Sequence, residues 1–81
     1  MKIVYFAWLR ERIGLPEEEL TTKAQTVAEL VAELAARDER HSLAFSDMGS
    51  VRVALDQTLA DLDAPLDGVT EVAFFPPMTG G

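Results

Sequence analysis

The sequence predicts an α+β domain in which a mixed sheet packs on one main helix. Residues 26–38 have the pattern of an amphipathic helix, and the segments on both sides of it are rich in β-branched and aromatic residues, which favour strands. The predicted order is strand, strand, helix, turn, strand, short strand, strand. This order suits a small sheet wrapped over one helix in two layers, the β-grasp arrangement.

The first third of the chain predicts a hairpin. Residues 2–8 are apolar on both faces, as expected of a central strand that is covered on at least one side. Residues 9–13 could add one helical turn, which Gly14 and Pro16 would end. Residues 17–23 are polar and predict a second strand at the sheet edge, where charge discourages mispairing.

The main helix has a clear start and one apolar face. Thr26 and Glu29 have the spacing of a capping box, in which each side chain can satisfy a backbone N–H group at the helix start. Apolar residues recur at helical spacing as Val27, Leu30, Val31 and Leu34. Arg37 and Arg40 lie near the predicted end, where the helix dipole favours cations. We expect this helix to form one wall of the core.

The remaining strands follow a polar stretch. Residues 51–55 alternate with period two, which predicts a half-buried strand, and Asp56-Gln57 is a candidate turn. Residues 59–66 are expected to be a loop, and the last strand is expected over residues 69–75. The folded domain should therefore cover residues 1–75, followed by a flexible C-terminal diglycine tail over residues 76–81.

Composition excludes several classes of function. The chain has no cysteine, so disulfides, zinc–thiolate sites, iron–sulfur clusters and thiol nucleophiles are ruled out. Its net charge of −7 makes nucleic acid and anionic membranes poor partners, whereas a protein with a basic face is a suitable one. No segment approaches the ~20 apolar residues that cross a bilayer. We expect a cytoplasmic protein.

The ionisable side chains do not predict an enzyme. His41 lies in a polar stretch and is expected to be a solvated surface residue; one histidine supplies little of a metal site and no plausible Ser-His-Asp set. The acidic groups lack the spacing of a calcium loop and are expected to be solvated; they are Glu17, Glu18, Glu19, Asp61, Asp63 and Asp67. We expect no bound cofactor and no metal.

The C-terminal segment is the strongest functional signal. Pro76-Pro77 is stiff and extended, and the six residues 76–81 could reach roughly 19 Å. Gly80-Gly81 has no Cβ atoms to obstruct passage through a narrow channel. If joined to AMP, the Gly81 carboxylate would become a mixed anhydride that a sulfur nucleophile could convert to a thiocarboxylate. The alternative is a frayed terminus without chemistry.

Two adjacent phenylalanines precede this segment. Successive strand residues point to opposite faces, so we expect Phe74, in phase with Val72, under the helix and Phe75 facing outward or at the rim of the sheet. Phe75 could anchor a partner or cover a loop of its own domain. Both possibilities stay open on the sequence, as does the question of which phenylalanine faces the partner.

Three segments carry a resemblance to a known family: Lys2–Gly14 (KIVYFAWLRERIG), Thr26–Leu30 (TVAEL) and Glu71–Gly81 (EVAFFPPMTGG). The chain resembles the molybdopterin synthase small subunits, which are ubiquitin-like sulfur carriers with a β-grasp fold. The similarity spans nearly the whole chain, and Phe-Pro-Pro-x-x-Gly-Gly is its specific part. Departures from the family are Asp56, where relatives commonly carry Asn, and the run Asp67–Glu71 before the last strand.

The resemblance implies a reaction cycle and a set of partners. A ubiquitin-activating-like adenylyltransferase would use ATP to adenylate Gly81, and a sulfur donor protein would supply the sulfur of a thiocarboxylate. The large synthase subunit, in an expected heterotetramer, would provide the catalytic side chains that transfer this sulfur to cyclic pyranopterin monophosphate. The residues implied to contact the partner are Phe75, Pro76, Pro77, Met78, Thr79 and Gly80.

Three other functions remain compatible with the sequence. The sulfur carrier of thiamine thiazole synthesis shares the fold and the diglycine. A ubiquitin-like protein modifier would join Gly81 to lysine side chains, and a plain interaction domain would use no chemistry at its terminus. The Pro-Pro pair and the residues Tyr5-Phe6-Ala7-Trp8-Leu9-Arg10 favour the molybdopterin synthase subunit over the thiamine carrier.

Overall fold

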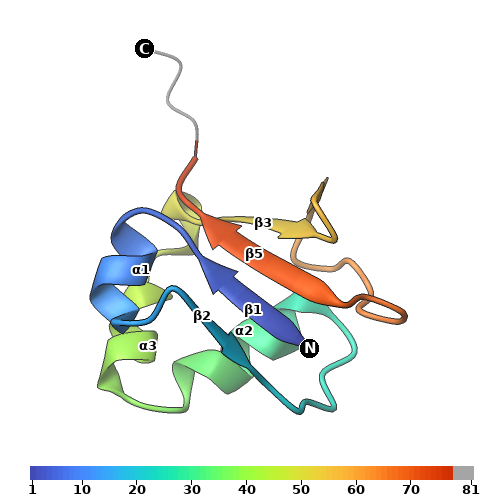
Figure 1. Ribbon diagram of the computed structural model, residues 1–81, viewed down its shortest axis with the longest axis horizontal. Helices are drawn as coiled ribbons and strands as arrows, with labels where there is room; N and C mark the ends of the chain where they lie inside the picture. The colour runs from blue at the N-terminus through green and yellow to red at the C-terminus, as the bar shows by residue number, and fades with distance from the viewer. Residues whose placement is uncertain (78–81) are drawn as a thin grey trace.

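Two parallel strands form the centre of a mixed sheet in the computed structural model, which describes residues 1–77. The elements in chain order are β1 (Lys2–Tyr5), α1 (Trp8–Ile13), β2 (Glu17–Glu19), α2 (Val27–Ala35), α3 (Glu39–Ala44), the 3₁₀ helix η1 (Met48–Ser50), β3 (Arg52–Leu55), β4 (Thr58–Ala60) and β5 (Glu71–Phe75). Figure 1 shows β1 and β5 side by side, with α1 and α3 grouped at one end of the sheet.

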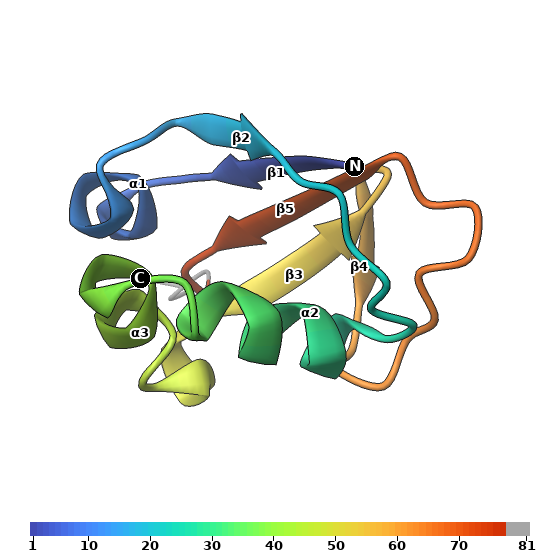
Figure 2. The same ribbon diagram turned by 90° about the horizontal axis from the view of Figure 1, so that it is seen from below.

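The strand order identifies the fold. The sheet order is β2-β1-β5-β3-β4, in which β1 and β5 are parallel and every other pair is antiparallel. Parallel strands need a long connection, and here that connection includes α2, which crosses one face of the sheet (Figure 2). The predicted β-grasp arrangement is therefore confirmed. No helix within residues 1–77 has the length and apolar character needed to cross a bilayer.

The core lies between α2 and the inner face of the sheet. Ile3 and Tyr5 of β1 and Val72 and Phe74 of β5 are at most 1% exposed, because alternate strand residues point to the same face. They pack with the predicted helix stripe Val27, Leu30, Val31 and Leu34, all of which are buried. Each such side chain contributes about 1.5–3 kcal/mol on burial, so these two central strands carry much of the stability.

Helix α2 starts as predicted but ends early. The Thr26 hydroxyl oxygen accepts a hydrogen bond from the Glu29 N–H group at 3.2 Å. The predicted helix over 26–38 is wrong at its C-terminal end, because α2 stops at Ala35 and a second helix begins after Asp38. The Asp38 carboxylate accepts from the His41 N–H group at 2.9 Å, and such a side-chain cap begins a new helix. Arg40 therefore belongs to α3.

The first two strands are also shorter than predicted. β1 stops at Tyr5, and Ala7, with φ of 55°, turns the chain into α1. The helical turn predicted over 9–13 is confirmed within α1, and Gly14 ends it in the left-handed region with φ of 88°. The edge strand predicted over 17–23 is confined to β2, but its edge position is confirmed.

Asp56 connects the β3–β4 hairpin to the start of β5. Asp56 and Gln57 have φ of 49° and 71°, which makes them the predicted two-residue turn. β4 occupies the first part of the expected loop 59–66. The Asp56 carboxylate accepts from the Thr70 hydroxyl at 2.7 Å and the Glu71 N–H group at 2.9 Å, and these bonds lower its pKa. The Asp56 side chain thus supplies the acceptor that joins the turn to β5.

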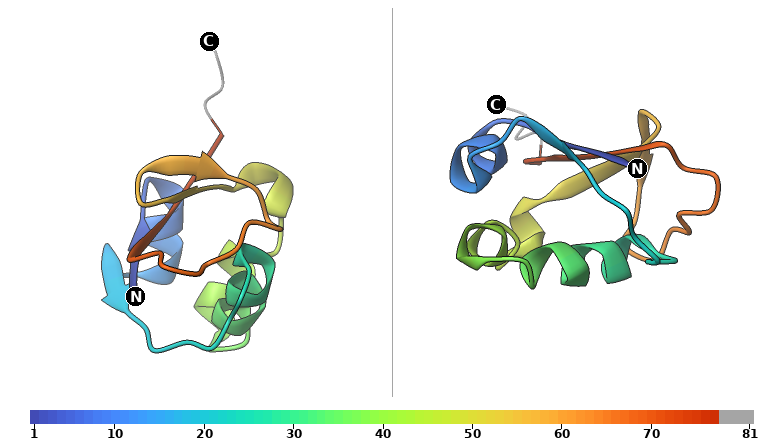
Figure 3. Two further views of the ribbon diagram at one scale, coloured as in Figure 1. Left: turned by 90° about the vertical axis from the view of Figure 1, so that its right-hand side faces the viewer. Right: turned by 60° about the horizontal axis from the view of Figure 1, so that its bottom comes forward.

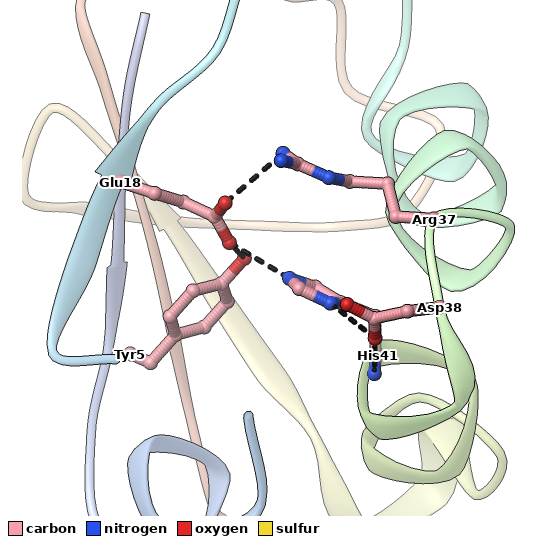
Figure 4. A network of polar contacts seen from close by, with 5 residues as sticks. All are labelled: Tyr5, Glu18, Arg37, Asp38 and His41. Atoms are coloured by element: carbon pink, nitrogen blue, oxygen red, sulfur yellow. Dashed lines mark hydrogen bonds and ion pairs between the residues drawn. The ribbon is translucent and has the colours of Figure 1, made fainter. Parts of the chain in front are cut away.

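A buried polar network joins β2 to α3 at the end of the sheet that carries the short helices (Figure 4). His41 is 3% exposed, so the prediction of a solvated histidine is wrong. Its Nδ1 atom lies 2.8 Å from an Asp38 carboxylate oxygen, and its Nε2 atom lies 2.8 Å from one of Glu18. Carboxylates only accept hydrogen bonds, so a ring nitrogen of His41 makes such a bond by donating its own N–H.

Glu18 is the centre of this network and was wrongly predicted to be solvated. Its carboxylate also accepts from the Tyr5 hydroxyl at 2.7 Å and pairs with Arg37 at 3.0 Å. Burial raises the pKa of Glu18, but the hydrogen bonds from His41 and Tyr5 and the charge of Arg37 outweigh it, so the pKa is below its usual value. Burial, followed by the bond to Glu18, raises the pKa of Tyr5.

The network predicts that acid destabilises the fold. The hydrogen bonds from His41 also lower the pKa of Asp38. A carboxyl group whose pKa is lower in the folded state stabilises the protein above its unfolded-state pKa, and this stabilisation is lost as the pH falls through the folded-state value. The ordinary values are 4.5 for Glu18 and 3.8 for Asp38. The free energy of unfolding in urea should therefore decrease below those pH values.

The substitution Glu18→Gln tests whether Glu18 contributes to the loss of stability in acid. The variant should be less stable at neutral pH, and its free energy of unfolding should depend less steeply on acid, because the amide cannot titrate. The remaining dependence would come from groups such as Asp38 and Asp56, whose pKa values are also lowered. Identical acid profiles for the variant and the parent protein would contradict a role for Glu18.

Candidate functional site at the end of strand β5

The base of the C-terminal segment is held by the centre of the sheet. The Phe6 N–H group donates to the Phe74 carbonyl at 3.0 Å on one side, and Arg52 of β3 lies opposite Phe75 on the other. Pro76 and Pro77 follow the strand and are half-buried. The predicted tip residues Met78, Thr79, Gly80 and Gly81 lie outside the residues that the structure describes. The segment therefore starts from a backbone that is fixed on both sides.

Phe74 and Phe75 lie on opposite faces of the sheet, as predicted. Phe74 is fully buried, stacks on Tyr5 with ring centroids 6.2 Å apart, and meets Phe45 edge-on at 4.9 Å. Phe75 is half-buried. Phe74 thus anchors β5 in the core, and Phe75 remains the candidate for contact with a partner.

The face of the sheet opposite α2 carries an apolar row. Strand register places Val4 beside Ala73, Ala73 beside Ala54, and Ala54 beside Leu59. Leu59 is 69% exposed, and Phe6, which follows β1, is 46% exposed. Large exposed apolar side chains gathered on one face are typical of protein-binding surfaces. Phe6 and Leu59 were not among the residues predicted to contact a partner, although the alternation of β1 points Phe6 to this face and the register of the hairpin does the same for Leu59.

The described site is a strand end held by its neighbours in the sheet. His41, which is buried, binds Glu18 between β2 and α3. Residues 1–77 contain no group of three or more His, Asp or Glu side chains that could hold a metal ion. What the described site supplies is a fixed strand end beside an exposed apolar face.

Comparison with known proteins agrees with this geometry. Residues 3–81 match the family model described as the ThiS family. The chain belongs to the ThiS family. This ThiS-family protein is 42% identical to the molybdopterin synthase sulfur carrier subunit of Escherichia coli over 100% of this chain and 99% of that one. The subunit of the same name from Haemophilus influenzae is 35% identical over the same shares.

A solved structure shows the same fold. Small archaeal modifier protein 1 from Haloferax volcanii superposes with a TM-score of 0.75, covering 100% of this chain and 98% of that one at 23% identity. The likeness confirms the ubiquitin-like β-grasp fold of this ThiS-family protein. The resemblance to sulfur carrier subunits seen in the sequence is likewise confirmed by the two curated relatives.

The two phenylalanines should differ sharply in their contribution to stability. Phe74→Ala should lower the free energy of unfolding by about 3–5 kcal/mol, because it leaves a cavity between Tyr5 and Phe45. Phe75→Ala should cost about 1 kcal/mol or less, because the side chain is outside the core. Urea unfolding of both variants measures the difference, and similar losses would place Phe75 in the core as well.

Proposed function

We propose that this protein is the sulfur-carrier subunit of a molybdopterin synthase. Its C-terminal Gly81 is adenylated, converted to a thiocarboxylate, and donates sulfur to the cyclic pyranopterin monophosphate precursor of the molybdenum cofactor. The observation that carries the proposal is the 42% identity, over the whole chain, to a relative named as this subunit. The matched residues include the complete segment from Phe75 to Gly81.

The chemistry takes place at the backbone of Gly81. A carboxylate oxygen attacks the α-phosphate of ATP and releases pyrophosphate, which gives an acyl adenylate with AMP as the leaving group. Sulfide released by a donor protein then attacks the acyl carbon, the bond from that carbon to the AMP oxygen breaks, and AMP leaves, so no cysteine of this chain is needed. ATP is used by the activating enzyme, so this chain itself holds no cofactor. Each product requires two such cycles, one for each dithiolene sulfur.

The partners follow from this cycle. The adenylyltransferase and the sulfur donor protein charge Gly81, and the large synthase subunit accepts the charged segment, in a heterotetramer and in the cytoplasm. Gly80 passes the narrow part of the channel, and Phe75, Pro76, Pro77, Met78 and Thr79 contact the partner. The exposed side chains of Phe6 and Leu59, on the open side of the sheet, support a docking surface there.

Two alternative functions have specific support. The family name favours a sulfur carrier, and a carrier for thiamine thiazole synthesis would use the same thiocarboxylate. The structural likeness to a small archaeal modifier protein supports covalent attachment of Gly81 to other proteins. Both alternatives require activation of Gly81, so the fate of the activated end separates them from the proposal.

Intact-mass analysis tests the proposed function. After incubation with the adenylyltransferase, ATP and a sulfur donor, the protein should gain the mass of one oxygen-to-sulfur exchange, and the charged form should yield molybdopterin with the large subunit and the precursor. The absence of the exchange under sulfur-replete conditions would exclude both carrier functions. Formation of protein conjugates in place of molybdopterin would favour the modifier.

Deletion of Gly81 is the matched control. The shortened protein should show no sulfur exchange and no molybdopterin formation, because Gly80 would present its carboxylate one residue short of the active sites. Its melting temperature should equal that of the full chain, because the described core ends with Phe74 of β5. A large loss of stability would mean that the segment has a structural role.

A further inference from the structure

A groove between α1 and η1 takes no part in the contacts described so far. It has a volume of about 310 Å³ and is lined by Trp8 and Arg12 of α1, Leu43 of α3, and Asp47 and Ser50 on the η1 side. We propose that this groove is a second docking site for the large synthase subunit, and that it receives an apolar side chain flanked by a carboxylate on that partner. The inference rests on the proposed function, in which the large subunit takes Gly81.

The position of the groove is fixed by the same residues that hold the end of β5. α1 begins two residues after Phe6, whose N–H group bonds to the Phe74 carbonyl. η1 ends two residues before Arg52, which lies opposite Phe75. In the left view of Figure 3, α1 (blue) and the turn of η1 (yellow) are seen on either side of the end of β5. A protein that encloses the C-terminal segment therefore comes close to the groove.

The groove has an apolar surface that is open to contact. Leu43 is 53% exposed although it belongs to α3, whose residues Ala44 and His41 are buried. Trp8, the only tryptophan of the chain, is half-buried beside it. Tryptophan and arginine are enriched among the residues that dominate binding energy at protein interfaces. Because the domain leaves these side chains accessible, they can bury further area against a partner.

The cation on the α1 wall of the groove indicates a carboxylate on the partner. The Arg12 guanidinium lies 5.5 Å from the centre of the Trp8 ring, and within residues 1–77 no carboxylate pairs with it at 4.0 Å or less. Asp47 on the opposite wall is already engaged, because it accepts from the Gly49 N–H group at 3.1 Å and the Ser50 hydroxyl at 3.0 Å. Arg12 thus offers an unneutralised cation in a protein of net charge −7.

The Arg12 cation would help to fix the angle at which the large subunit docks on this domain. A predominantly basic partner face is attracted by the net charge of the domain as a whole, and that attraction alone does not fix a docking angle. An acidic residue on the partner that must meet Arg12 favours one register, and like charges disfavour the others. The groove would therefore align the large subunit while the C-terminal segment enters it.

Calorimetric titration of the full-length protein with the purified large subunit tests this proposal. Arg12→Glu should weaken binding by about tenfold, a loss of the size seen at interface hot spots, and the deficit should shrink at high salt. Arg12→Lys should retain most of the affinity because it keeps the charge. Leu43→Ser should weaken binding several-fold with little dependence on salt. Unchanged melting temperatures would show that the folds are intact.

Matched substitutions outside the groove provide the controls. Lys23→Glu reverses an exposed cation on the β2–α2 connection, and Leu62→Ser removes an exposed leucine that does not line the groove. Both should bind the large subunit like the parent protein. Adenylation and sulfur charging of the groove variants should proceed at the parent rate, since the proposed contact is with the large subunit.

The outcomes separate this inference from the proposed function. Equal affinities for groove variants and controls would overturn the docking site while the sulfur-carrier role stood. A loss of charging by the adenylyltransferase, with normal binding to the large subunit, would overturn the choice of partner. If the parent protein neither bound the large subunit nor acquired sulfur, the proposed function itself would fail.

Discussion

The insertion of β5 between β1 and β3 is the constraint on which the rest of the structure depends. The strand pairs with β1 in parallel and with β3 in antiparallel orientation, so its backbone is bonded on both sides. Its partner β1 lies at the opposite end of the sequence, and the intervening chain must supply the crossing helix and both sheet edges. Local unfolding at the base of the C-terminal segment would therefore have to break two ladders of hydrogen bonds.

A polar network closes one end of the small domain. At the junction of β2 and α3 the side chains of Glu18 and His41 are largely buried and lie within hydrogen-bond distance of each other, and such pairing makes polar groups tolerable away from water. Every buried side-chain nitrogen and oxygen in the described part has a hydrogen-bond partner. Tyr5 belongs to both regions, because its ring stacks on Phe74 and its hydroxyl bonds to Glu18. The core under β5 and the polar junction are thus physically coupled.

The sequence predicted correctly those features that depend on residues close together in the chain. The Thr26 cap, the stripe of α2, the turn at Asp56-Gln57 and the alternation that separates Phe74 from Phe75 all depend on near neighbours in the chain. The burial of His41 does not. It requires that Asp38 interrupt the predicted helix and that α3 then place His41 within hydrogen-bond distance of Glu18 in β2, which is 23 residues away in the chain. The polar residues next to His41 in the sequence therefore led to the wrong prediction that its side chain is solvated.

The candidate site also includes features that depend on residues far apart in the sequence. The exposure of Phe6 and Leu59 depends on the assembled sheet, whose register places Leu59 in line with Ala54, Ala73 and Val4 on the open face. The diglycine, by contrast, is evident from the sequence, because the role proposed for it uses only main-chain atoms. Under that proposal the catalytic side chains belong to the partners, so the fold of this chain has to hold a strand end firmly and display a surface that a partner recognises. The bonded sides of β5 meet the first requirement, and the exposed apolar face beside it meets the second.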